Sequence, residues 1–403
     1  MLRTLSSALV VPLAIVSLTC CSPWRSMEAL DLIRDIAAGE APSALKRETP
    51  EPIRQTIAYT VAGRHYLGDI YRPAEGQAKA AAVFVPGVVK DGKDDPRLVA
   101  FAKSFARMGF LVLVPEIPNL RALVISASDS QVIADAIRHL AAAGEFDGKQ
   151  PIGLFAFSYA AGPALIAALE PDTRHLVRFV YAVGPYYSVE SVVTYFTTGH
   201  YRPAPDEPWS TGQPSPYARW VFLRSNAGRV EDPSDRAALI AIAERKLADA
   251  NAEISDLTQG LGPAGRSVYA LLTNRDPDRV HGLIAQLPLP VREEMNALDL
   301  SRRDLSSLQA RLVVMHGRTD PMIPFTEGMA LAQAAQGSAD LYVLDSLSHV
   351  ELEFSGLCDF YKLWKVTYII LAERDGMPPP RYAAPSAAGR RSQNAGVPLH
   401  ERQ

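Results

Sequence analysis

The strongest constraint on the fold is an alternation of strand-length apolar runs with helical patterns along most of the chain. Residues 80–85 read Ala-Ala-Ala-Val-Phe-Val and residues 110–114 read Phe-Leu-Val-Leu-Val. Strands that are apolar throughout are typical of a parallel sheet covered by helices on both faces. Further apolar runs lie at residues 152–157, 177–183, 312–315 and 341–344, with helical patterns at 128–143, 160–169, 325–336 and 354–372. The sequence therefore predicts an α/β fold with a mostly parallel central sheet.

One long segment interrupts this alternation. Residues 188–305 begin with many aromatic residues and prolines and continue as three or four helical patterns. A segment of this length between two core strands is too long for a connecting loop, so we expect a mainly helical cap inserted into the core. The predicted core is then residues 51–187 and 306–374, opened by a β-hairpin around Ala62-Gly63. Residues 375–403 lack periodicity and are predicted to be a disordered tail.

The N-terminus has the pattern of an export leader. Residues 1–20 contain a single charge, Arg3, followed by a short apolar run, which is typical of a signal peptide and too short to span a bilayer comfortably. Leu18-Thr19-Cys20-Cys21 resembles a bacterial lipobox, which implies that Cys21 carries lipid after cleavage. Cys20 stands where a small residue is usual, so either cysteine is a possible acceptor. Simple secretion and an uncleaved anchor are the alternatives.

A lipoprotein leader implies a place for the protein. We expect an exported protein of the cell envelope that faces the periplasm or the exterior. Its contact with the membrane would be limited to the N-terminal lipid, and residues 21–50 would form the tether between membrane and folded body. Cys358 is then the only cysteine beyond the leader, and we expect it to be a small buried residue.

Charge and motifs exclude several classes of function. The chain has 41 Lys and Arg against 44 Asp and Glu, without a basic block, so nucleic acid is not an expected partner. It contains no His-Glu-x-x-His, no paired cysteine motif and no phosphate-binding glycine loop, and we expect neither a metal nor another cofactor.

A serine follows one of the predicted core strands directly. The apolar run 152–157 leads into Ser158 and then into a helical pattern, and a serine at such a turn exposes its hydroxyl at the carboxyl edge of the sheet. Strand and helix nearly touch there, so small residues are needed two positions before and after the serine. Ala156 and Ala160 stand at these positions, in place of the more usual glycines.

An acidic residue and a histidine follow two later strands. Asp320 lies a few residues after the run 312–315, and His349 a few residues after the run 341–344. Carboxyl ends of parallel strands share one edge of the sheet, so both side chains are expected on the same side as Ser158. Asp345 is a less suitable acid because it comes directly off its strand.

Together these segments resemble the α/β-hydrolase superfamily, particularly its dienelactone-hydrolase-like and prolyl-peptidase-like esterase branches. The most specific motif is His-Gly-x-x-Asp-x-x-Ile-Pro at residues 316–324. The resemblance covers about residues 51–187 and 306–374 and leaves out the cap. It implies the α/β-hydrolase fold.

The resemblance implies a role for each residue, and acyl-transfer chemistry requires the same roles. Ser158 would be the nucleophile, His349 the base that takes its proton, and Asp320 the carboxylate that orients the base. The oxyanion hole needs two N–H donors, for which Tyr159 and Val88 are the candidates. Val88 lies in Pro86-Gly87-Val88, where this superfamily commonly has His-Gly-x. His316 ends a buried strand and is expected to be structural.

The expected function is a serine hydrolase that cleaves a carboxylic ester or related acyl bond of a small-molecule substrate. A peptidase or amidase with the same triad is the first alternative. A non-catalytic envelope binding protein on this fold is the second, because alanine replaces both elbow glycines. We expect the cap to lie over Ser158, with Tyr186, Tyr187 and Tyr195 as the first substrate contacts.

Overall fold

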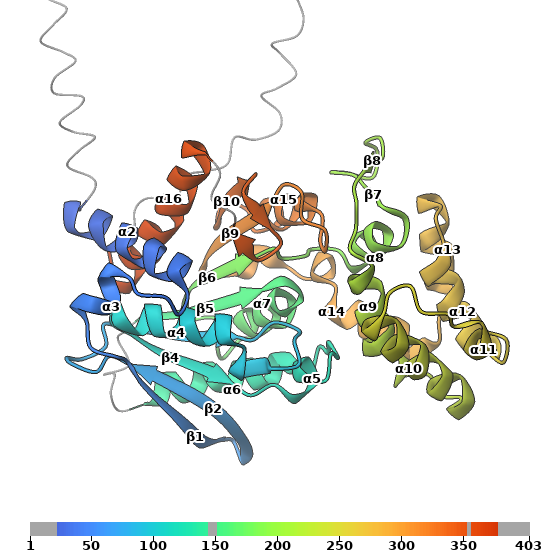
Figure 1. Ribbon diagram of the computed structural model, residues 1–403, viewed down its shortest axis with the longest axis horizontal. Helices are drawn as coiled ribbons and strands as arrows, with labels where there is room; N and C mark the ends of the chain where they lie inside the picture. Colours follow the sequence, from blue (N-terminus) through green and yellow to red (C-terminus); the bar gives the residue numbers. More distant parts are fainter. Residues whose placement is uncertain (1–21, 144–150, 353–355, 378–403) are drawn as a thin grey trace, which may run out of the picture.

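The core of the protein is an eight-stranded sheet with the strand order β1-β2-β4-β3-β5-β6-β9-β10 (Figure 1). The computed structural model describes residues 22–143, 151–352 and 356–377. All neighbouring strands from β4 to β10 pair in parallel, and only β2 runs against its neighbours. This order is that of the α/β-hydrolase fold, so the predicted fold class is confirmed. The strands of this sheet are β1 (Ile53–Val61), β2 (Arg64–Arg72), β3 (Ala80–Val85), β4 (Phe110–Pro115), β5 (Ile152–Phe157), β6 (Val177–Val183), β9 (Arg311–Gly317) and β10 (Ala339–Leu344).

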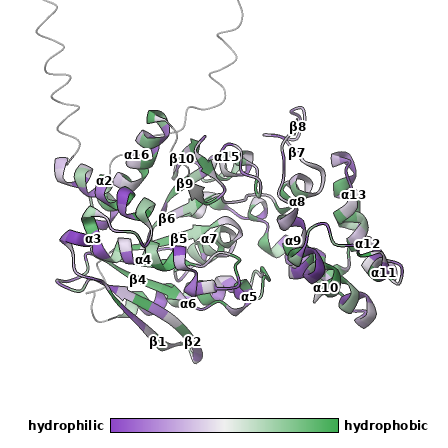
Figure 2. Ribbon diagram, viewed as in Figure 1, coloured by the Kyte–Doolittle hydropathy of each residue, from purple (hydrophilic) through white to green (hydrophobic). Residues whose placement is uncertain are grey.

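The central strands are buried on both faces because alternate side chains enter two different clusters. In β3, Ala81 and Val83 pack with α6 and α7 on one face, whereas Ala82 and Phe84 pack with α2, α4 and α16 on the other. Figure 2 shows the central strands as mostly hydrophobic and the tip of the β1–β2 hairpin as hydrophilic. The helices of the core are α2 (Pro23–Ala38), α3 (Ala44–Glu48), α4 (Pro96–Arg107), α5 (Pro118–Arg121), α6 (Asp129–Ala142), α7 (Ala161–Leu169), α15 (Phe325–Ala334) and α16 (Leu357–Arg374), with short turns η1 (Gly92–Asp94) and η2 (Ser158–Ala160).

Residues 188–305 form a mainly helical insertion between β6 and β9, which stands to one side of the sheet in Figure 1. Its helices pack on one another, with α9 against α10 and α8 against α9, α13 and α14. The elements of this cap are α8 (Val189–Thr198), β7 (His200–Tyr201), β8 (Ser210–Thr211), α9 (Pro216–Ala227), α10 (Pro233–Ala248), α11 (Ser255–Thr258), α12 (Pro263–Thr273), η3 (Pro277–Arg279), α13 (Val280–Ala285), α14 (Leu289–Leu298), η4 (Leu300–Arg302) and η5 (Leu305–Ser307). A second small hairpin, β11 (Leu347–Ser348) with β12 (Glu351–Leu352), follows β10.

The segment expected to be a tether is part of the folded body instead. Helix α2 buries Ala29, Leu32 and Ile33 against the face that also carries α4 and α16. Figure 1 places α2 beside α16. The backbone N–H of Ser22 donates to the hydroxyl of Tyr368 (2.9 Å). These apolar positions recur at helical spacing, and α2 docks because their burial removes apolar surface from water.

A buried carboxylate fixes the N-terminal helices further. Asp35 accepts a hydrogen bond from Ser104 of α4 (2.6 Å) and pairs with Lys46 of α3 (2.9 Å). Burial raises the pKa of Asp35, but hydrogen bonds from Ser104, Ser43 and Lys46 outweigh burial and lower the pKa overall. The charged carboxylate therefore joins α2, α3 and α4.

Several expectations concern residues outside the described ranges. The predicted signal peptide, both candidate lipid acceptors Cys20 and Cys21, and residues 378–403 of the predicted tail all lie there. Among the helices of the described residues, none is both long and apolar enough to cross a membrane. Cys358 lies at the start of α16 and is exposed, which contradicts the expectation of a buried residue, because the first turn of α16 projects beyond the core.

Candidate active site

Ser158 is the first residue of η2 and lies on a strained turn directly after β5. Its φ is +58°, in the left-handed region that residues with a side chain rarely adopt. Ala156 and Ala160, on either side, are completely buried, so the small residues at these positions accommodate the close approach of strand and helix. The structure therefore builds the sharp strand-to-helix turn with alanines where glycines are more usual.

Asp320 and His349 contact each other at the same edge of the sheet. Nδ1 of His349 lies 2.8 Å from Oδ2 of Asp320, and Oδ1 of the carboxylate accepts the backbone N–H groups of Met322 (2.7 Å) and Ile323 (3.0 Å). Burial raises the pKa of Asp320, but hydrogen bonds from His316 and His349 outweigh burial and hold the pKa well below its usual range. An ionised carboxylate only accepts hydrogen bonds, so Nδ1 of His349 carries the proton and Nε2 is left as the basic nitrogen.

His316 is a second histidine against the same carboxylate. Its Nε2 lies 2.9 Å from the carbonyl oxygen of Ile323 and 3.4 Å from Oδ2 of Asp320. A carbonyl oxygen accepts only, so Nε2 of His316 is the protonated nitrogen. The ring is fully buried, as expected for a structural residue, but the sequence did not indicate its contact with Asp320.

Gly184 provides the space in which this pair lies. The residue follows β6 and has a φ of +58°; a Cβ there would stand 3.2 Å from Oδ2 of Asp320 and 3.3 Å from Nδ1 of His349. A side chain would press on the carboxylate and imidazole and would also be strained in this backbone conformation. Glycine is therefore the residue that leaves the pair undisturbed.

The three predicted residues come from strand ends that meet at one edge. Ser158 follows β5, Asp320 follows β9 and His349 follows β10, and these strands belong to the order β5-β6-β9-β10. Within the described residues, Ser158 has no hydrogen bond to His349. Catalytic hydrogen bonds are often long before substrate binds and tighten in the complex.

The two candidate oxyanion donors lie on the segments predicted for them. Tyr159 is in the first turn of η2, where backbone N–H groups have no acceptor within the helix. Val88 is in the loop after β3 and packs half-buried against the core. That loop continues into η1, so contacts that hold η1 also restrain the end of the loop that carries Val88.

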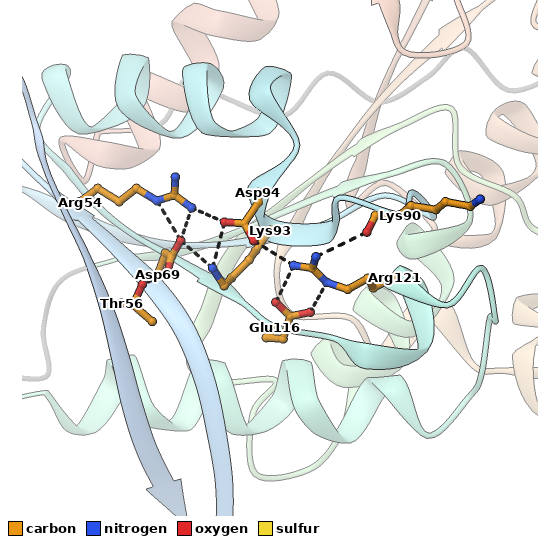
Figure 3. Close-up of polar contacts among 8 residues, drawn as sticks. All are labelled: Arg54, Thr56, Asp69, Lys90, Lys93, Asp94, Glu116 and Arg121. Carbon is orange, nitrogen blue, oxygen red and sulfur yellow. Dashed lines mark hydrogen bonds and ion pairs between the residues drawn. The ribbon is translucent and has the colours of Figure 1, made fainter.

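A network of charged side chains fixes η1 (Figure 3). Asp94 accepts hydrogen bonds from Arg54 of β1 (2.6 Å) and from Arg121 of α5 (2.9 Å), and Lys93 pairs with the buried Asp69 of β2 (3.1 Å). Burial raises the pKa of Asp94, but hydrogen bonds from Lys93, Arg121 and Arg54 lower it to about 2. The network is thus fully charged at neutral pH.

Arg121 ties this network to the segment nearest Val88. It donates to Glu116 (2.8 Å) and, more weakly, to the carbonyl oxygen of Lys90 (3.5 Å). In Figure 3 its guanidinium lies between Glu116 and Lys90. No local sequence pattern indicates this network, because its members are scattered over residues 54–121 and meet only in the fold.

A small cavity lies between Tyr159, the residue after Ser158, and the cap. It has a volume of about 50 Å³ and its lining includes Tyr159, Tyr186 and helices α8, α9 and α14 of the cap. Most of the lining is apolar, and the cap contributes Val192, Phe196, Phe222 and Met295. The residue after Ser158 is thus part of a pocket that the cap completes.

The three tyrosines predicted as first contacts lie in different surroundings. Tyr186 lines the cavity, and its hydroxyl donates to the carbonyl oxygen of Leu298 (2.9 Å). Tyr195 does not line the cavity, and its hydroxyl donates to the carbonyl oxygen of Asp320 (3.0 Å). Tyr187 is half-buried beside Glu327 and outside the cavity lining.

Glu327 is a buried residue that the sequence analysis missed. Its Oε2 accepts the backbone N–H groups of Tyr187 (2.9 Å) and Ser188 (2.7 Å), where the chain enters the cap. Burial raises the pKa of Glu327 to about 7, although the two N–H groups and His316 oppose the rise. A glutamate in the first turn of a predicted helix is ordinarily an exposed N-terminal charge, so nothing local indicated this role.

Asp345, the rival acid, has an exposed side chain. It forms an exposed ion pair with Arg318 (2.6 Å). In the part of the chain that the structure describes, no group of three or more His, Cys, Asp or Glu residues is placed to hold a metal ion.

Comparisons with known proteins found structural neighbours only. No protein-family model matches the chain, and no curated protein matches it significantly. A hyperthermophilic esterase from Pyrobaculum calidifontis is similar with a TM-score of 0.45 and 15% identity over 93% of this chain and 99% of its own. Dienelactone hydrolase from Anabaena variabilis has a TM-score of 0.41, 12% identity and coverages of 79% and 96%. An acylaminoacyl peptidase from Pyrococcus horikoshii has a TM-score of 0.44, 11% identity and coverages of 85% and 44%.

Proposed function

We propose that the protein is a serine hydrolase that cleaves a carboxylic ester or a related acyl bond through an acyl-Ser158 intermediate. The observation that carries the proposal is the hydrogen bond between His349 and Asp320 at the sheet edge where Ser158 occupies a strained turn. A strained serine, an imidazole with a free Nε2 and a buried carboxylate that orients it are the parts that nucleophilic acyl transfer requires.

Acylation follows from these positions. The Oγ atom of Ser158 attacks the ester carbonyl carbon while its proton passes to Nε2 of His349. Asp320 stabilises the imidazolium that results, because its carboxylate remains charged. The N–H groups of Tyr159 and Val88 would bind the oxyanion. Collapse of the tetrahedral intermediate breaks the bond to the alcohol, which leaves with the proton from His349.

Deacylation repeats these steps with water as the nucleophile. His349 takes a proton from water, the hydroxide oxygen bonds to the acyl carbon, and the second tetrahedral intermediate releases the acid. The proton on His349 returns to Oγ of Ser158. Ser158 and His349 thus end the cycle in their starting protonation states.

The charges of the cavity favour an ester over an aminoacyl substrate. Its lining contains one carboxylate among the described residues, that of Glu294. Glu294 already accepts the backbone N–H of Ala127 (2.7 Å) and pairs with Arg229 (3.1 Å). A substrate ammonium group would find no unpaired anion there, and its burial would be costly.

Export and lipid attachment are a separate part of the proposal. The leader pattern of residues 1–20 and the Cys20-Cys21 pair support cleavage and acylation at Cys21 or Cys20. In that case the folded body begins directly after the lipid, because α2 starts at Pro23. The protein would then be held close to the envelope membrane.

Labelling of the nucleophile tests the proposed function. A fluorophosphonate probe should modify Ser158 of the purified protein, and peptide mapping by mass spectrometry identifies the site. Ser158→Ala is the matched control and should take up no probe. Hydrolysis of p-nitrophenyl esters but not of aminoacyl anilides would support the ester assignment. An unlabelled Ser158 in folded protein would refute the mechanism.

A further inference from the structure

The imidazole of His316 is clamped between the central sheet and α15. His316 is the residue before the last of β9, where it pairs with Val343 of β10, and its ring is fully buried. A Cβ on Gly328 of α15 would lie only 2.6 Å from Nδ1 of the ring, so the helix packs directly on the imidazole. The ring therefore has a fixed position.

One nitrogen of this ring faces the loop that carries the acid. Nε2 of His316 lies 2.9 Å from the carbonyl oxygen of Ile323 and 3.4 Å from Oδ2 of Asp320. The shorter contact is a hydrogen bond, and the longer one is an electrostatic share in the same N–H. The two oxygens belong to opposite ends of the loop 320–323. His316 thus touches both ends of the loop that presents Asp320 to His349.

The other nitrogen of the ring has no partner. Nδ1 of His316 is buried without a hydrogen bond among the described residues. Such an atom costs the free energy of its desolvation. An apolar side chain of similar size would avoid this cost if the position only had to be filled. The imidazole therefore points to a role for Nε2, the nitrogen that faces the acid.

The carboxylate of Asp320 divides its contacts between its two oxygens. Oδ1 accepts the backbone N–H groups of Met322 (2.7 Å) and Ile323 (3.0 Å), whereas Oδ2 faces both His349 (2.8 Å) and His316 (3.4 Å). Burial raises the pKa of Asp320, but hydrogen bonds from His316 and His349 outweigh burial and lower it. Without His316, Oδ2 would serve His349 alone, while the two N–H groups would still hold Oδ1. The imidazolium of His349 would then be bound more strongly.

We propose that His316 is a positioning residue of the triad, which fixes the loop of Asp320 through Ile323 and shares Oδ2 of the carboxylate with His349. The inference rests on the proposed function and adds one side chain to the group that orients the base. His316 acts on the reaction through Asp320. Because it moderates the hold of the carboxylate on the imidazolium, His349 remains available as a base at lower pH.

Two amide side chains of different length test the role of Nε2. The amide nitrogen of His316→Gln can take the place of Nε2, whereas that of His316→Asn reaches only the place of Nδ1. With p-nitrophenyl butyrate, His316→Asn should lower kcat roughly threefold to tenfold with KM nearly unchanged. The acid limb of its kcat/KM profile should move to higher pH by roughly 0.3 to 0.7 of a pH unit. His316→Gln should restore most of both.

Tyr195→Phe separates this effect from a general loosening of the loop. The hydroxyl of Tyr195 donates to the backbone carbonyl of Asp320 (3.0 Å) rather than to its carboxylate, so this variant should leave the acid limb in place. Glu327 of α15 interacts electrostatically with His316 and has a pKa raised to about 7, so the profiles are also compared in a Glu327→Gln background.

The position of the acid limb decides between positioning and packing. An acid limb that stays in place or moves to lower pH in His316→Asn would overturn the inference. An equal movement in Tyr195→Phe would also overturn it, because the carboxylate would then not be the point of action.

NMR of wild-type protein labelled with nitrogen-15 histidine gives a measurement that does not depend on how the variants fold. His316 should be the Nε2–H tautomer at neutral pH, and its buried N–H should exchange slowly with solvent. An Nδ1–H tautomer would overturn the inference, because Nε2 could not donate. Labelling of Ser158 with an unmoved acid limb would overturn the inference alone. Absence of labelling would instead overturn the proposed function and the inference with it.

Discussion

The Nδ1 atom of His349 lies 2.8 Å from Oδ2 of Asp320, although 29 positions separate the two residues in the chain. Parallel pairing of β9 with β10 brings them together, because both residues follow the carboxyl ends of these strands. Gly184 leaves room for the contact at the end of β6. This contact leaves Nε2 as the basic nitrogen of His349.

Substitutions in the triad should act through chemistry rather than folding. Ser158→Ala and His349→Ala should each lower kcat/KM for p-nitrophenyl butyrate by roughly 10⁴-fold or more, because nucleophile and base act as a unit. Asp320→Asn should lower it by roughly 10³-fold to 10⁴-fold, since an amide no longer selects the correct tautomer of His349. Circular dichroism should show folded protein in each case.

The rival carboxylate is the control for this series. Asp345 pairs with Arg318 at the surface, so Asp345→Asn should leave kcat/KM within about twofold of wild type. If Asp345→Asn lost most of its activity while Asp320→Asn stayed active, the catalytic acid would be Asp345 and the assignment of Asp320 would be wrong.

Arg121 should affect the rate of the chemical step without touching substrate. Arg121→Met removes the ties to Asp94, Glu116 and Lys90 and loosens the loop that carries Val88. Misplacing an oxyanion donor weakens binding of the transition state more than binding of the ester. We expect kcat to fall about tenfold with KM nearly unchanged in steady-state kinetics.

A distant arginine provides the comparison. Arg245 of the cap pairs with Asp256 at the surface, and Arg245→Met should leave kcat unchanged. Equal loss of kcat in both variants, or a change confined to KM in Arg121→Met, would argue against a role in positioning Val88.

Glu327 should make the stability of the protein depend on pH. Burial raises the pKa of Glu327 from 4.5 to about 7, so the folded protein holds this proton over a range where the unfolded chain has lost it. The contribution of Glu327 to the free energy of unfolding therefore falls as pH rises from about 4.5 to about 7. Glu327→Gln keeps an oxygen acceptor for the N–H groups of Tyr187 and Ser188 but removes the titration.

Thermal melts at several pH values measure this effect. Between pH 5 and pH 8 the Tm of the wild type should fall by several degrees more than that of Glu327→Gln. Other groups titrate in both proteins, so their contributions cancel in the difference. Parallel Tm curves would mean that Glu327 titrates at its ordinary pKa.

The export proposal has a direct chemical readout. Expressed with its leader in a bacterial host, the protein should lose residues 1–20, or 1–19, and carry acyl chains on the new N-terminal cysteine. Intact mass spectrometry resolves both the cleavage and the lipid. Cys21→Ser should shift acylation to Cys20 or abolish it. A protein that retains Met1 and has no lipid would remove the basis for the envelope location.

The sequence predicted the sheet well because the relevant signals are local. Buried strands were visible as apolar runs, and Ser158, Asp320 and His349 each follow one of them by a few residues. Parallel strands then placed all three at one edge without further information. Some strand boundaries differ slightly from the predicted ones. For example, β10 begins at Ala339 rather than at Leu341.

The features that were missed depend on contacts between distant segments. Helix α2 has apolar positions at helical spacing, but the surface that covers them comes from α4 and from α16, which lies more than 300 residues later. Glu327 is buried because the entry to the cap passes over it, which no pattern near residue 327 reveals. The cavity beside Tyr159 likewise depends on three distant cap helices that line it.

The packing of α2 on α16 also determines when the chain can complete its fold. Hydrogen bonds join Ser22 to Tyr368 and Ser26 to Trp364, which are 346 and 338 positions apart. During synthesis the N-terminus emerges first, and α2 can meet α3 and α4 early but cannot meet α16 until the final helix has been made. The surface of α2 that faces α16 therefore stays uncovered until the end of the chain is made, and the last helix completes the packing of the first.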